Sequence, residues 1–184
     1  LRKGKKPLVI TDPREYGILR KYRNFDTVLF KDGKELSALL NKYLGRRVGI
    51  DHEMTSIARF KRTKKLLKNR RFVDISDSLS NVRSVKTVRE VKKIHEACKI
   101  TEEIISKVSK TVKEGQTEKE IAKKLDMLAL SGSEGASFPT IVAAGHNSAT
   151  PHHIAGSAKI RNGNILLIDF GVVYEGYCSD LTRT

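Results

Sequence analysis

Short apolar runs alternate with amphipathic helical segments over roughly the first half of the chain. The apolar runs lie at residues 8–11, 26–30, 47–51 and 72–76, and a helix-like segment follows each of the first three. Strands that alternate with helices of this length predict βαβ units and a mainly parallel sheet. No glycine-rich phosphate loop follows any of these strands, so the pattern does not indicate a dinucleotide-binding fold.

The helical segments of this region carry start and stop signals. Asp12-Pro13 predicts the start of a helix over residues 13–22. A second helix is predicted over residues 33–45, and a basic amphipathic one over residues 52–68.

A different organisation begins near residue 84. Apolar positions at three- and four-residue spacing between residues 87 and 112 predict a long amphipathic helix, which we expect to end at Glu114-Gly115. Thr117 and Glu120 have the spacing of a capping box and predict a second helix, which ends near Gly132 and packs against the first.

Strand-like patterns then return at residues 138–145 and 165–174, separated by a polar loop. We therefore expect two domains, residues 1–83 and residues 84–184. The chain opens on Leu1 without a methionine and closes directly after a strand pattern, so we also expect a fragment truncated at both ends.

Positive charge is concentrated in the first half of the chain. Residues 1–90 contain 24 Lys and Arg against 10 Asp and Glu, a net charge of +14, whereas residues 91–184 have a net charge of +1. This asymmetry fits a nucleic-acid-binding half or a solvated surface that serves solubility or heat tolerance. The basic residues do not interleave with aromatic residues as a base-stacking surface requires, so we do not expect a nucleic-acid partner.

The cysteine content and the hydropathy of the chain indicate its cellular compartment. Cys98 and Cys178 lie far apart and form no CxxC pair, which favours a reducing cytoplasm over a disulfide scaffold. No apolar run is long enough to span a bilayer, so no membrane partner is expected.

Two aspartates, Asp169 and Asp180, interrupt a strand-forming segment at residues 168–184, IDFGVVYEGYCSDLTRT. A two-residue turn at 175–176 would place Asp169 opposite Thr182, because opposed residue numbers then sum to 351. The two aspartates would project from one face as diagonal neighbours, with Cα atoms about 7–8 Å apart. A three-residue loop would instead put them on opposite faces.

Two carboxylates on one face of a half-buried hairpin repel each other and lose hydration, and a divalent cation would compensate them. Gly171 would leave room between them. The alternative is that both acids lie at the sheet surface or pair with Arg161 or Arg183, although the apolar residues 165–170 argue against exposure. Two carboxylates are too few for a complete site, so further ligands are required.

Three histidines lie in the loop that precedes this strand. His146, His152 and His153 fall within eight residues, and Pro151 stiffens the loop. A single loop histidine is usually solvated, but this density indicates a functional role for at least one of the three.

The segments FPTIVAAGHNSATPHH (138–153) and LLIDFGVVYEGYCSDLTRT (166–184) resemble the first half of the catalytic domain of the pita-bread metallopeptidases, in particular the prolidase and aminopeptidase P branch. VRSVKTVREVKKIHEACKITEEI (82–104) resembles the linker and first helix of that family, and residues 1–80 resemble its creatinase-like N-terminal domain without the opening part. The resemblance implies an α/β N-terminal domain followed by the first half of an α+β pita-bread catalytic domain.

The resemblance also implies roles for individual residues. Asp169 and Asp180 take the positions of the first two ligands of a dinuclear metal centre, with Asp180 bridging both ions. His152 takes the position of a catalytic histidine that contacts substrate near the scissile bond, and His153 is implied to line the substrate pocket. Thr182 is implied to support a metal ligand without binding metal itself. The implied cofactors are two divalent metal ions, Mn²⁺ or Co²⁺ first, with Zn²⁺ or Fe²⁺ as alternatives.

The implied function is a metal-dependent exopeptidase that hydrolyses Xaa-Pro bonds through a metal-activated water, of the Xaa-Pro dipeptidase or aminopeptidase P type. Its substrates would be short proline-containing peptides, and the resemblance suggests a homodimer. The family takes its remaining ligands from later in the chain, so we expect the activity to belong to a longer parent protein. The alternatives are a non-catalytic binding module of the same fold, associated with nucleic acid or chromatin, and creatinase-type C–N hydrolysis without metal.

Overall fold

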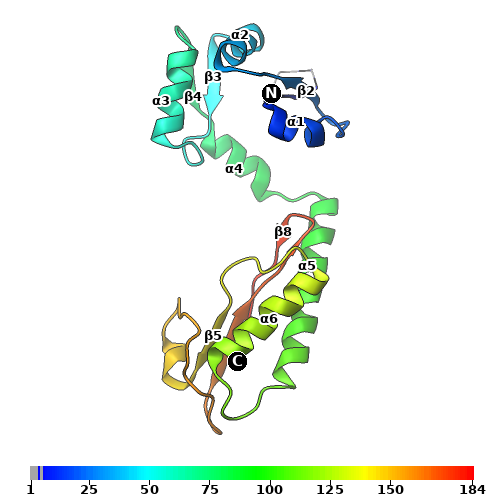
Figure 1. Cartoon of the computed structure of the whole chain (residues 1–184), viewed down its shortest axis with the longest axis vertical. Coiled ribbons are helices and arrows are strands. Elements are labelled where there is room, and N and C mark those ends of the chain that lie inside the picture. The colour runs from blue at the N-terminus through cyan, green and yellow to red at the C-terminus, as the bar shows by residue number, and fades with distance from the viewer. Residues whose placement is uncertain (1–3, 5) are drawn as a thin grey trace. The chain divides into compact units, whose positions relative to one another are not determined.

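The predicted alternation of strands and helices is present in the computed structural model, which describes residues 4 and 6–184. The chain divides into two units, Leu1–Val85 and Lys86–Thr184, each of which is described by itself (Figure 1). The strands of the first unit are β1 (Leu8–Thr11), β2 (Asp26–Leu29), β3 (Arg47–Ile50) and β4 (Arg71–Asp74).

The strand pairing of the first unit is parallel, as predicted, but it forms two ladders instead of one sheet. Strand β1 pairs with β2, and β3 pairs with β4. Each βαβ unit thus pairs its own two strands, and within the described residues no ladder joins the two pairs.

Four helices accompany these strands: α1 (Pro13–Leu19), α2 (Gly33–Tyr43), α3 (Ile57–Leu66) and α4 (Ser76–Ser84). The prediction of a helix from residue 52 is wrong, because α3 begins only at Ile57. The Asp51 carboxylate accepts the backbone N–H groups of Glu53 (3.1 Å) and Met54 (3.2 Å) and holds a turn there. The Ser56 hydroxyl then caps the helix.

The core of the first unit is small. Val48, Ile50 and Leu67 are buried and pack against partly buried side chains of α2, α3, β4 and the residue after α2, which are Leu40, Leu44, Phe60 and Phe72.

The second unit begins with two capped helices, α5 (Val88–Ser109) and α6 (Glu118–Gly132), which pack side by side (Figure 1). The predicted capping box of Thr117 and Glu120 is confirmed. Helix α5 ends five residues before the predicted Glu114, and a turn follows it. The helix N-terminus is not part of the core, since Val88 and Val91 are 74% and 53% exposed.

The sheet of the second unit contains β5 (Ile141–Ala144), β6 (Leu166–Phe170) and β9 (Leu181–Arg183), in the order β5-β6-β9 and all antiparallel. A short hairpin of β7 (Val173–Tyr174) and β8 (Tyr177–Cys178) continues beyond it. The one-turn 3₁₀ helix η1 (Gly145–Ala149) follows β5. Helices α5 and α6 cover one face of the sheet and form the core with it (Figure 1).

The tip of the hairpin is fixed to the beginning of α5. Glu90, which completes the capping box of α5 with Thr87, also accepts a hydrogen bond from the Tyr177 hydroxyl at 3.0 Å. The Lys93 ammonium lies 3.1 Å from the Glu175 carboxylate and 5.3 Å from the centroid of the Tyr177 ring. These contacts set the position of the hairpin along the helix.

Membrane insertion through a helix finds no support in the part of the chain that the structure describes. None of its helices combines the length and the apolar character that crossing a bilayer requires.

Candidate metal centre and substrate loop

The predicted register of the aspartate hairpin is confirmed. Tyr174 pairs with Tyr177 and Asp169 pairs with Thr182, so the turn is formed by Glu175 and Gly176. Both turn residues have positive φ, 46° and 77°, as a type I′ turn requires. Glycine meets this demand without strain, and Glu175 meets it as one of two described non-glycine residues with positive φ.

Asp169 lies on the face of β6 that points away from the helices. Its neighbours Ile168 and Phe170 are buried in the core, and strand alternation therefore turns Asp169 to the other face, where it is partly exposed. The Thr182 hydroxyl donates a hydrogen bond of 2.9 Å to one oxygen of the Asp169 carboxylate. The predicted neighbourhood of these two residues is thus observed.

Asp180 lies one residue before β9 and two residues before Thr182, and it is exposed. The argument that apolar neighbours exclude exposure is therefore wrong for Asp180. The apolar side chains of β6 at Ile168 and Phe170 turn toward α5 and α6, so they leave the aspartate face of the sheet uncovered by the helices. That Asp169 and Asp180 project from one face stays a prediction based on the confirmed register.

The prediction that Gly171 leaves room between the two acids is wrong. A Cβ atom at this position would lie 2.0 Å from the backbone oxygen of Ser179 and 2.5 Å from the Ser137 hydroxyl. The space is thus filled by the backbone of the opposite segment. Glycine is required here because the two segments approach so closely.

Side-chain hydroxyls replace part of the strand ladder at this close approach. The Ser179 hydroxyl accepts the backbone N–H of Val172 (2.9 Å), and it lies 2.6 Å from the Thr101 hydroxyl in the interior. The Ser137 hydroxyl donates to the Ser179 backbone oxygen at 2.8 Å. The β6–β9 ladder and the β7–β8 ladder therefore have the same register, although the strand pairing between them is interrupted.

Pairing of the aspartates with Arg161 or Arg183 is not seen among the ion pairs of the described residues. The Arg183 guanidinium instead lies 3.4 Å from the Glu102 carboxylate of α5. Strand alternation explains this choice, since Arg183 and Thr182 are neighbours in β9 and must point to opposite faces.

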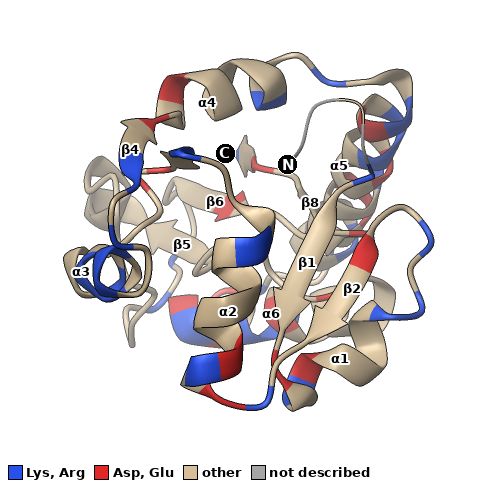
Figure 2. Cartoon of the chain, turned by 90° about the horizontal axis from the view of Figure 1, so that it is seen from above, with Lys and Arg blue, Asp and Glu red and all other residues tan. Residues whose placement is uncertain are grey.

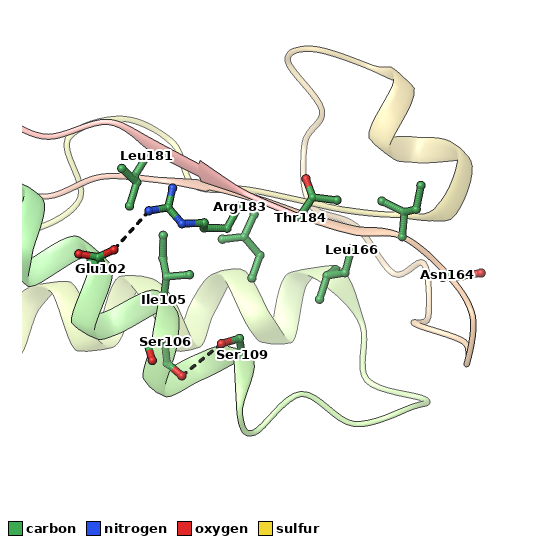
Figure 3. Close-up of a pocket in the computed structure, with 11 residues that line it drawn as sticks. Glu102, Ile105, Ser106, Ser109, Asn164, Leu166, Leu181, Arg183 and Thr184 are labelled. Atoms are coloured by element: carbon green, nitrogen blue, oxygen red, sulfur yellow. Dashed lines mark hydrogen bonds and ion pairs between the residues drawn. The ribbon is translucent and has the colours of Figure 1, made fainter.

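A groove of about 720 Å³ lies between α5 and the strands β6 and β9 (Figure 3). Its lining includes Glu102, Ile105, Leu166, Leu181 and Arg183. It is therefore on the helix side of the sheet, opposite to Asp169, and does not belong to the candidate metal centre.

The histidine loop places its three imidazoles differently. His146 and His152 are exposed, whereas the His153 side chain is only 17% exposed. The His153 Nε2 atom lies 2.8 Å from the Glu118 carboxylate. His153 is thus oriented toward the interior of the unit by its contact with Glu118, and its place in a substrate pocket stays a prediction.

Glu118 is the functional candidate that sequence reasoning missed. It is fully buried, and its oxygens lie near four donors: the backbone N–H of Ala144, the Asn147 amide, His153 and the backbone N–H of Gly156. Burial alone would raise the pKa of Glu118, but the hydrogen bonds from Asn147, Ala144, His153 and Gly156 outweigh it and lower the pKa to about 2. A signal was present, because Glu118 shares the helical spacing of the buried residues Ile121, Ala122, Leu125 and Ala129.

The two hairpin carboxylates are the candidate metal ligands of this chain. Within the described residues, no group of three or more His, Cys, Asp or Glu side chains is placed to hold a metal ion. The donor chemistry of Asp169 and Asp180 nevertheless suits a divalent cation. A carboxylate has about four acceptor positions, and the Asp169 carboxylate uses one of them for Thr182.

Comparisons with known proteins connect these features. The sequence model of metallopeptidase family M24 matches residues 92–184, and that of the creatinase/prolidase N-terminal domain matches residues 1–85. The chain is 31% identical over 173 residues to a Xaa-Pro dipeptidase of Pyrococcus furiosus. The matched region covers 92% of this chain and 48% of the relative. The chain thus spans about half the length of the curated relatives it matches.

Solved structures give the same result. An X-Pro aminopeptidase from Thermotoga maritima MSB8 matches with a TM-score of 0.87 and 34% identity, over 96% of this chain and 51% of its own. A prolidase from Pyrococcus furiosus matches with a TM-score of 0.84 and 30% identity, over 96% and 51% of the two chains. The chain therefore belongs to metallopeptidase family M24, with a creatinase-type α/β N-terminal domain followed by part of an α+β pita-bread catalytic domain.

Proposed function

We propose that the whole protein is a metal-dependent exopeptidase that hydrolyses Xaa-Pro peptide bonds. The observation that carries the proposal is Asp169, which Thr182 orients from across the β6–β9 ladder on the uncovered face of the sheet. Membership in family M24 and relatives named Xaa-Pro dipeptidase and X-Pro aminopeptidase support the reaction and the substrate class.

In this proposal Asp169 and Asp180 are ligands of two divalent metal ions, Mn²⁺ or Co²⁺. When bound, such ions supply an activated water and polarise a peptide carbonyl. Thr182 fixes one oxygen of Asp169 and leaves the other free of a hydrogen bond among the described residues.

His152 is proposed to contact the substrate next to the scissile bond. Its side chain is exposed at the loop that follows η1, so it is free to donate or accept a hydrogen bond. Histidine is the side chain most often used for proton transfer to or from a reacting group.

The test is proline release from Xaa-Pro dipeptides and from longer peptides with proline in the second position. The whole protein is assayed after chelation and again after addition of Mn²⁺ or Co²⁺. We expect metal-dependent turnover, which Asp169→Asn and Asp180→Asn abolish together with metal binding. Comparison of the dipeptide with the longer peptides decides between dipeptidase and aminopeptidase P.

Glu96→Gln is the matched control, because it removes one negative charge from an exposed position of α5 in the same unit. It should leave metal content and turnover unchanged. Absence of metal-stimulated turnover on every proline-containing peptide would contradict the proposal.

We also propose a cytoplasmic homodimer. Free Cys98 and Cys178 are compatible with a reducing compartment. Light scattering of the purified protein should give twice the protomer mass, and a monomer mass would remove this part of the proposal.

The second candidate is a binding module for nucleic acid, and the observation that favours it is the basic helix α3. The exposed basic residues of this helix include Lys61, Arg62, Lys64 and Lys65. Figure 2 shows α3 nearly end-on, with its Lys and Arg positions in blue. Filter binding of duplex DNA across a salt titration decides the matter, because phosphate contacts weaken steeply with salt. We expect no binding of duplex DNA at physiological ionic strength.

A further inference from the structure

The loop that carries His152 is held from the interior by a single carboxylate. One oxygen of Glu118 lies 2.8 Å from the backbone nitrogen of Ala144, at the end of β5, and 2.8 Å from the amide nitrogen of Asn147. The other oxygen lies 2.8 Å from His153 Nε2 and 3.0 Å from the backbone nitrogen of Gly156. The carboxylate therefore reaches both ends of the loop over residues 144–156 and two positions within it.

Between its two ends the loop has little other polar attachment. At the ends, the Gly145 backbone N–H donates to the Ile165 backbone oxygen at 2.8 Å, and the Lys119 backbone N–H donates to the Gly156 backbone oxygen at 3.0 Å. Among the hydrogen bonds of the described residues, those that join residues 146–155 to residues outside 144–156 go to Glu118, from Asn147 and His153. Others are internal to residues 144–156, such as the bond from the Ser148 hydroxyl to the Gly145 backbone oxygen. Removal of the Glu118 charge should thus loosen the loop without disturbing the helices.

The negative charge of Glu118 is matched to this task. Glu118 is the first residue of α6, where the helix dipole favours an anion. Burial combined with four donors leaves the carboxylate no alternative partner, and a glutamine would turn its NH₂ group toward two of those donors. Glu120, in the same helical turn, is exposed and caps the helix without contact to the loop.

We propose that Glu118 is a positioning residue that fixes the loop carrying His152 for the peptidase reaction. The proposal rests on the proposed function, since His152 has a catalytic role only there. It assigns Glu118 no contact with substrate or metal.

The test compares Glu118→Gln with the matched control Glu120→Gln in the whole protein loaded with Mn²⁺. Displacement of a catalytic group by about 1 Å can cost about 100-fold in rate. We therefore expect kcat of Glu118→Gln to fall about 100-fold, while KM and bound metal stay close to those of the unaltered protein. Glu120→Gln should match the unaltered protein in all three.

A double-mutant cycle separates positioning from general damage. If Glu118 acts through His152, Glu118→Gln should have little further effect on kcat in a His152→Ala background. Independent effects, with the two losses multiplying, would overturn the proposal. So would a Glu118→Gln enzyme that keeps the kcat of the control.

Amide hydrogen exchange gives a readout that does not depend on activity. We expect exchange over residues 144–156 to be at least about tenfold faster in Glu118→Gln than in Glu120→Gln, with α5 unchanged. Equal exchange in the two variants would overturn the proposal. A protein inactive on all Xaa-Pro peptides would refute the proposed function, and this measurement would still decide whether Glu118 holds the loop.

Asn147→Ala serves if Glu118→Gln does not fold. It removes one donor and leaves the buried carboxylate with Ala144, His153 and Gly156. A loss in kcat of about tenfold, absent in the His152→Ala background, is expected. An unchanged kcat together with unchanged loop exchange would contradict the proposal.

Discussion

Two regions of the second unit use carboxylates in opposite ways. In the loop region, Glu118 is buried and four donors of the same chain surround it. In the hairpin region, Asp169 is partly exposed with Thr182 as donor, and Asp180 is exposed. An acid whose acceptor positions are filled by protein donors organises structure, and one whose positions remain free can bind an ion from outside.

Acidification should affect the loop region most strongly, in metal-free protein. The pKa of Glu118 is lowered from 4.5 to about 2 on folding, so its ionised form stabilises the fold fully above pH 4.5. This contribution, on the order of 3 kcal/mol, should be lost as the pH falls from 4.5 through 2. Urea unfolding between pH 2 and pH 7 measures it, and Glu118→Gln should show a flatter dependence. Identical slopes in the two proteins would contradict the comparison.

A methyl group at Gly171 should disrupt the hairpin region. Gly171→Ala places a Cβ atom 2.0 Å from a backbone oxygen, so the two segments must separate. We expect a loss of about 2–3 kcal/mol in the free energy of unfolding, measured by urea denaturation. Gly132→Ala is the control, because its nearest neighbour would be a side-chain carbon at 4.0 Å. Equal stability of the two variants would show that the close approach is not fixed.

Loss of the Thr182 hydroxyl should weaken metal binding without removing either of the proposed ligands, Asp169 and Asp180. Thr182→Val leaves the Asp169 carboxylate without its 2.9 Å hydrogen bond. Metal affinity measured by calorimetry on the whole protein should fall about 10- to 100-fold. Thr184→Val, an equally conservative change two residues later, should keep the affinity. Unchanged affinity in Thr182→Val would mean that the hydroxyl does not orient the ligand.

The smallest expected effect concerns the buried hydroxyl pair behind the hairpin. Thr101→Val removes the 2.6 Å contact with Ser179, which keeps its bonds to Val172. Thermal and urea unfolding should show a loss of about 1 kcal/mol. Ser106→Ala, on the exposed side of the same helix, should have no effect. A comparable loss in both would indicate a general helix effect.

Local signals made the hairpin register and the α6 cap predictable. The turn at Glu175-Gly176 and the Thr117–Glu120 spacing depend on neighbouring residues only, and both are confirmed. The start of α3 was missed because a turn held by Asp51 competes with the amphipathic pattern.

The features that could not be predicted from the sequence depend on contacts between residues far apart in the chain. The partners of Glu118 lie 26 to 38 residues away, and the backbone atom that excludes a side chain at Gly171 belongs to Ser179 on the returning segment. Charge and periodicity along the chain do not predict contacts between such distant residues. An acidic residue on the apolar stripe of a helix nevertheless indicates that a buried partner exists.

The double use of Glu90 has a consequence for the order of folding. The same carboxylate closes the N-terminal turn of α5 and receives the hydroxyl of a tyrosine 87 residues further along. A helical turn forms within about a microsecond, while closure of so long a stretch of chain is far slower. We therefore expect the helix to form first, with its acceptor already in place, and the hairpin to gain its axial position later, when Tyr177 and Glu175 dock onto Glu90 and Lys93.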